Sequence, residues 1–178
     1  MINNHCYKFE EKNYKKGIFD NFVDATYIIT MINSKRHENI IKQLDEYQPT
    51  KKIFILYNYG YITCKKNLRE NTPSYDLTDA YINILYHSKL QNFNNILILE
   101  DDFIFDIKIK DKEIINEINY FMNKNTNNKI NFNLGPIPLL SYPNIIKHNN
   151  IFKSICSFGS HGIIYNKNIQ GRKSIKNY

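Results

Sequence analysis

The sequence lacks the apolar segments that mark membrane-spanning and secreted proteins. Its longest aliphatic runs, such as Ile96 to Leu99, are far shorter than the roughly 20 residues that cross a bilayer. The first residues, Met1 to Gly17, contain no apolar core of the signal-peptide type. We therefore predict a protein without a membrane span and with a cytoplasmic location.

Cysteine is also scarce. The chain has three cysteines, Cys6, Cys64 and Cys156, an odd number with no pairwise spacing. This pattern does not predict a disulfide framework, and we expect free thiols in a reducing compartment.

The sequence lacks the features that are typical of a nucleic-acid-binding protein, although its net charge is +7. The lysines are scattered, no helix shows a basic stripe, and no zinc-finger or RNP-like motif is present. We predict no nucleic-acid partner. The dispersed positive charge favours a small anionic ligand such as a nucleotide phosphate.

What the sequence does contain is enough apolar material for one folded domain. Its 178 residues are 42% hydrophobic and 14% aromatic, which is typical of a globular chain with a sizeable core. Residues 1–24 are polar and weakly patterned, and we expect an irregular lead-in there. Residues 25–178 show no internal repeat or low-complexity linker and are predicted to form a single domain.

Strand and helix patterns alternate along the chain. Apolar β-branched segments predict buried strands over residues 25–32, 52–57 and 96–99. Periodic apolar positions predict helices capped by Ser34 and Asp76, and a third over residues 112–122. This order predicts an α/β fold with a mostly parallel central sheet flanked by helices.

The last third of the chain predicts further strands. "KINFNL" alternates and predicts a strand that ends at "GPIP". Two later segments, 154–158 and 163–165, predict a strand pair on either side of "GSHG".

Three consecutive acids, Glu100 to Asp102, follow the strand "ILIL" directly. Adjacent carboxylates are costly to keep ionised unless a cation or hydrogen-bond donors compensate them. Mg²⁺ and Mn²⁺ are commonly held by one or two carboxylates and the phosphates of a substrate. The acids are therefore either turn residues or part of a metal–phosphate site. Their place at the carboxyl end of a buried strand favours the site, on the same sheet edge as the segment from Thr30 to Arg36.

Several segments resemble, in matching order, the family 25 glycosyltransferases, which include lipooligosaccharide and collagen galactosyltransferases and relatives in large DNA viruses. "ILILEDDFIF" resembles the family's strand–EDD motif, and "YIITMINSKRHENIIKQL" is similar to its opening strand and arginine-bearing helix start. "DLTDAYINILYHSKL" resembles the helix before the acidic motif. "FNLGPIPLL" and "GSHGIIYNK" resemble the later Leu-Gly-x-x-Pro and Gly-Thr-His-Ala segments. The likeness covers residues 25–167, and a viral chain would be located in the host cytoplasm or the virion.

This resemblance implies a GT-A-like, that is Rossmann-like, fold and a metal-dependent glycosyltransferase of the hexosyltransferase type. Such an enzyme moves a sugar from a nucleotide-sugar donor to a hydroxyl of a glycan or protein acceptor, with Mn²⁺ or Mg²⁺ as cofactor. The matched positions are Thr30, Arg36, Glu100 and Asp101 for the donor and Asp102 and His161 for the metal. No residue matches a catalytic base.

The likeness has two departures. "GSHG" carries Ser and Gly where the family has Thr and Ala, and the chain stops at Tyr178, earlier than family members do. A C-terminally truncated GT-A-like fold is thus expected, and the alternative function is a non-catalytic GT-A-like binding module.

For several of these residues the sequence leaves a structural alternative open. His161 fits a loop histidine as well as a ligand, and Arg36 fits an exposed helix start as well as a phosphate contact. Asp76 and Asp79 are expected to cap a helix, while Lys65 and Lys66 are expected to be solvated.

Overall fold

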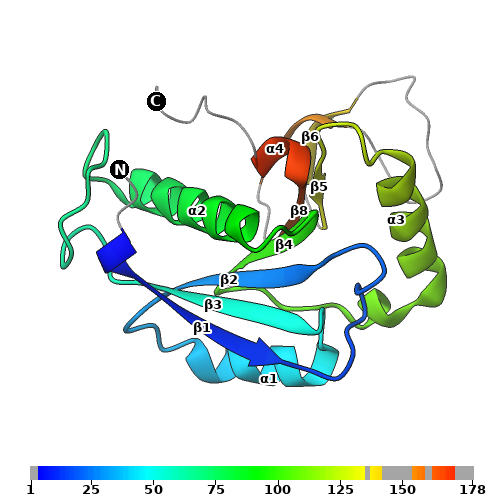
Figure 1. Ribbon diagram of the computed structural model, residues 1–178, viewed down its shortest axis with the longest axis horizontal. Helices are drawn as coiled ribbons and strands as arrows, with labels where there is room; N and C mark the ends of the chain where they lie inside the picture. Colours follow the sequence, from blue (N-terminus) through cyan, green and yellow to red (C-terminus); the bar gives the residue numbers. More distant parts are fainter. Residues whose placement is uncertain (1–3, 135–136, 142–153, 159–161, 171–178) are drawn as a thin grey trace.

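The computed structural model describes residues 4–134, 137–141, 154–158 and 162–170 (Figure 1). Side chains are described for residues 5–134 and 162–168. The strands are β1 (Tyr7–Asn13), β2 (Ala25–Met31), β3 (Lys52–Asn58), β4 (Asn95–Glu100), β5 (Asn131–Asn133), β6 (Ile137–Ser141), β7 (Ser154–Phe158) and β8 (Gly162–Asn166). The helices are α1 (His37–Tyr47), α2 (Pro73–Leu90), α3 (Lys112–Lys124) and α4 (Lys167–Gln170), with 3-10 turns η1 (Asn4–Cys6) and η2 (Ile107–Lys110).

Six strands form one mixed sheet in the order β1-β3-β2-β4-β8-β5. The three central strands β3, β2 and β4 run parallel, while β1, β8 and β5 join antiparallel to their neighbours. The strand–helix–strand order predicted this parallel centre. Each helical crossover returns the chain to the end of the sheet where the previous strand began, so the next strand runs in the same direction. The predicted α/β class with helices flanking a central sheet is confirmed.

Helices cover both faces of the sheet (Figure 1). On one face, α2 packs through Ala80, Ile84 and Leu85 on side chains that include Tyr27 and Ile98. On the other face, α1 and α3 share a second apolar cluster with the opposite side chains of the same strands. Both faces of β2 and β4 are therefore buried, which explains their continuous apolar sequences.

The prediction of an irregular lead-in over residues 1–24 is wrong for β1. Residues 7–13 pair with the whole of β3, from Tyr7 opposite Asn58 to Asn13 opposite Lys52. As an edge strand, β1 buries few side chains, so its sequence "YKFEEKN" carries little of the apolar pattern that identifies central strands.

Both predicted helix caps are also wrong. Helix α1 begins at His37 after Arg36, and the Ser34 hydroxyl hydrogen-bonds to Asp101. Helix α2 begins at Pro73, and its N-cap is Thr72, whose hydroxyl accepts a hydrogen bond from the Tyr75 amide. Proline at the first helical position and threonine before it are a common helix start.

The strands around "GSHG" do not pair with each other. Strand β7 pairs with β6 in a separate two-stranded sheet, whereas β8 lies between β4 and β5 in the main sheet. His161 and residues 135–136, on which other predictions depend, lie outside the described residues.

The prediction of free thiols is wrong for two of the three cysteines. Cys6 and Cys64 form a disulfide between residues 58 positions apart, with Cα atoms 5.6 Å from each other. The cysteines therefore give no argument that the protein is located in a reducing compartment. None of the helices in the described part of the chain combines the length and hydrophobicity needed to cross a membrane.

Candidate functional site

A cleft of about 460 Å³ lies at the carboxyl ends of the parallel strands β2, β3 and β4. This is the sheet edge at which the sequence predicted a site. The lining residues come from the ends of three strands, the loop after β3 and the first turns of α2: Ile29, Thr30, Met31, Asn58, Tyr59, Gly60, Tyr61, Ile62, Thr63, Pro73, Asp76, Leu77, Glu100 and Asp101. Three of the predicted donor-binding residues, Thr30, Glu100 and Asp101, thus line one cavity.

Asp101 joins the end of β4 to the segment that follows β2. Its Oδ2 accepts hydrogen bonds from the hydroxyls of Thr30 (3.1 Å) and Ser34 (2.9 Å). Its Oδ1 accepts one from Arg36 Nη1 at 2.6 Å. These donors compensate the charge of the middle acid, so Asp101 is occupied in holding the residue 30–36 turn in place.

Glu100 is half-buried and lies close to the tyrosines Tyr81 and Tyr165. Its Oε1 accepts a hydrogen bond from the Tyr81 hydroxyl at 3.0 Å. Burial and the Glu100 carboxylate raise the pKa of Tyr81 far above its ordinary value and raise the pKa of Tyr165 to about 12. Both phenols therefore stay protonated at neutral pH. Within the described residues, no side chain donates a hydrogen bond to the other oxygen of Glu100, Oε2.

Two of the remaining predicted residues, Asp102 and Arg36, do not line the cleft. Asp102 is exposed in the turn after β4 and does not line the cavity. The side chain of Arg36 is 57% exposed and reaches the site only through Asp101. The position of His161 lies outside the described residues, so its proposed role as a metal ligand is untested.

One carboxylate that lines the cleft has no ionic partner in the described part of the chain. Asp101 pairs with Arg36, and Asp76 pairs with Lys66 at 2.5 Å. Glu100 forms no ion pair with any described residue, and the lining contains no lysine or arginine. The carboxylate of Glu100 would repel a nearby phosphate, and a cation bound between them would remove this repulsion.

The acids fit a divalent cation held by a small number of protein ligands. Mg²⁺ and Mn²⁺ prefer carboxylate oxygens and are commonly bound by one or two of them together with substrate phosphates. Of the three acids, Glu100 fits this role best, because it lines the cleft and, among the described residues, accepts one side-chain hydrogen bond, whereas the oxygens of Asp101 accept three. The ligand atoms of the three acids do not converge into one cluster in the described part of the chain.

Sequence reasoning missed the loop after β3 and the residues that hold it. Lys66 was expected to be solvated, but its side chain is fully buried against Asp76. Asp76 was expected to cap α2, but it lines the cleft and is 5% exposed. The only local signal was Gly60, two residues after the end of β3, because glycine at such a position indicates a turn.

No protein-family model matches this chain. No curated protein matches it either.

Proposed function

We propose that this protein is a GT-A-like glycosyltransferase. It would bind a nucleotide sugar in the cleft and transfer the sugar to a hydroxyl of a glycan or protein acceptor, with Mn²⁺ or Mg²⁺. The observation that carries the proposal is the position of Glu100, without an ionic partner among the described residues, at the carboxyl edge of three parallel strands. Ligands of open α/β sheets bind at this edge.

Two further features of the cleft suit a nucleoside diphosphate. Its lining includes the first turn of α2, and the N-terminal end of a helix favours phosphate groups. Tyr59 and Tyr61 also line the cleft and offer aromatic surface of the kind on which a nucleobase stacks. The helix end would bind the diphosphate, and the two tyrosines would bind the base.

Glu100 and Asp102 would hold the metal ion, and Asp101 would position them through the residue 30–36 turn. A bound divalent ion supplies charge stabilisation for the departing nucleoside diphosphate. We assign no side chain as the base that deprotonates the acceptor.

Calorimetric titration with uridine and guanosine diphosphate sugars, with and without Mn²⁺, tests the proposal. We expect saturable binding that needs the ion, and Glu100→Gln and Asp102→Asn should each weaken it about tenfold or more, because loss of even an outer partner of a metal site costs 10–100-fold. Glu113→Gln removes an exposed carboxylate from the start of α3 and should leave the affinity unchanged. Metal-independent binding, or full affinity in both Glu100→Gln and Asp102→Asn, would contradict the proposal.

A turnover assay separates the enzyme from the non-catalytic alternative. Released nucleoside diphosphate in the presence of acceptor identifies a transferase. Metal-dependent binding of the donor without any release, across acceptors and metals, would identify a binding module.

A further inference from the structure

One side of the cleft is built by the loop after β3, residues 59–66, which we call the wall segment. Residues 59–63 line the cavity. Gly60 has a φ of 76°, a conformation that side-chain-bearing residues rarely adopt, and a Cβ there would lie 2.7 Å from the end of Met31. The shape of the cleft therefore depends on how the wall segment is held.

Cys6 holds both ends of the lining part of this segment. Its carbonyl accepts a hydrogen bond from the Tyr59 amide at 3.1 Å, and its sulfur forms the disulfide with Cys64. Cys6 directly precedes β1, which pairs with β3 along its whole length. The disulfide thus attaches the wall segment to the edge of the central sheet.

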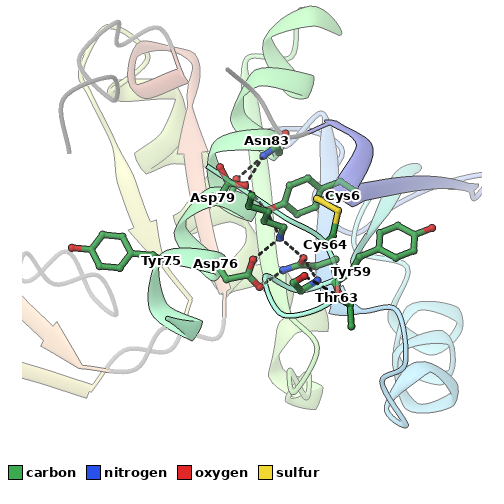
Figure 2. A network of polar contacts seen from close by, with 12 residues as sticks. Cys6, Tyr59, Thr63, Cys64, Tyr75, Asp76, Asp79 and Asn83 are labelled. Carbon is green, nitrogen blue, oxygen red and sulfur yellow. Dashed lines mark hydrogen bonds and ion pairs between the residues drawn. A yellow bond between two sulfur atoms is a disulfide. The ribbon is translucent and has the colours of Figure 1, made fainter. Parts of the chain in front are cut away.

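Lys66 forms a second attachment two residues farther along. Its Nζ donates hydrogen bonds to Asp76 Oδ1 (2.5 Å), Asn58 Oδ1 (2.6 Å) and the Tyr7 hydroxyl (2.9 Å). Asn58 also donates to the other oxygen of Asp76 at 3.0 Å. Figure 2 shows this polar cluster beside the disulfide, with Asp76 and Asp79 projecting from α2.

The two attachments differ in kind. The Lys66–Asp76 pair is buried, and removing either partner would leave the other charge without compensation inside the protein. The disulfide can be opened without that penalty, since a dithiol reductant converts it into two thiols while itself becoming a disulfide. Cys64 is partly exposed, so a reductant can reach it.

We propose that the Cys6–Cys64 disulfide is a positioning device for the cleft: it holds the wall segment in its ligand-binding shape, and its reduction loosens the segment and weakens ligand binding. Lys66 keeps the far end of the segment attached in both states. The effect on affinity rests on the proposed nucleotide-sugar binding, whereas the effect on the wall segment does not.

Hydrogen exchange measured by mass spectrometry tests the attachment without any ligand. Peptides covering residues 59–66 should exchange about tenfold faster after reduction, equivalent to about 1.4 kcal/mol of lost local stability, while peptides of α1 keep their rates. Cys64→Ser should exchange fast with or without reductant. Cys156→Ala, which leaves the disulfide intact, should respond like the natural chain. Equal exchange of the wall segment in the oxidised and reduced proteins would overturn the proposal.

The affinity for a uridine or guanosine diphosphate sugar with Mn²⁺ tests the consequence for the cleft. Reduction and Cys64→Ser should each weaken binding about tenfold, because a ligand must then order the wall segment again. Faster exchange with unchanged affinity would overturn the positioning role. If the oxidised protein binds no nucleotide sugar, the proposed function fails, and the exchange experiment alone decides whether the disulfide holds the wall segment.

Discussion

Three adjacent acids at one strand end have three different environments. Asp101 accepts three hydrogen bonds, Glu100 faces the cleft and receives one from Tyr81, and Asp102 is exposed in the turn. The sequence predicted a special role for the three acids together, but not the different environment of each one. The donors to Asp101 lie 65 to 71 positions away along the chain, so no local pattern reveals them.

Asp101→Asn tests this division of roles at the residue scale. The variant should lower the free energy of unfolding by about 1–3 kcal/mol, since a hydrogen bond to a charged group is worth about that much. Most of this loss should come from the Thr30 and Ser34 bonds, because the exposed Arg36 pair is screened by solvent. Urea denaturation measures the change.

Glu70→Gln is the control for Asp101→Asn, because it removes an exposed carboxylate outside the cleft lining and should change stability by less than about 0.5 kcal/mol. Equal stability of Asp101→Asn and the natural protein would show that Asp101 does not hold the residue 30–36 turn.

At the scale of elements, periodicity predicted most of the described helices and strands, and the errors lie at ends and edges. The buried strands β2, β3 and β4 were predicted almost residue by residue, because their apolar sequences are continuous. Edge strand β1 was missed, since only a minority of its side chains is buried. The starts of α1 and α2 were misplaced, because several residues before each helix could cap it and tertiary contacts decide among them.

Thr72→Ala tests the observed start of α2. Removing an N-cap hydroxyl should lower the free energy of unfolding by about 1 kcal/mol. Thr78→Ala makes the same chemical change at an exposed position in the helix interior, where alanine is the better helix former, and should be neutral or slightly stabilising. Thermal or urea denaturation of both variants gives the comparison, and a Thr72→Ala protein as stable as Thr78→Ala would contradict the assignment.

At the scale of the whole molecule, topology predicted which end of the sheet carries the cleft, but not which residues form its opposite side. The carboxyl ends of parallel strands meet at one edge, so Thr30, Glu100 and Asp101 could be placed together from sequence. The opposite side of the cleft depends on the Cys6–Cys64 disulfide and the Lys66–Asp76 pair. Cysteines 58 positions apart, and one of two adjacent lysines in a loop, carry no sequence signal that identifies their partners. These contacts could therefore be found only from the three-dimensional structure.

The most direct measurement is a crystal structure of the oxidised protein with Mn²⁺ and a nucleoside diphosphate sugar, with the ion located by its anomalous scattering. We predict a manganese peak within coordination distance of Glu100 or Asp102, with the diphosphate in the cleft between the end of β4 and the wall segment. A nucleotide bound elsewhere, or an ion remote from both acids, would contradict it.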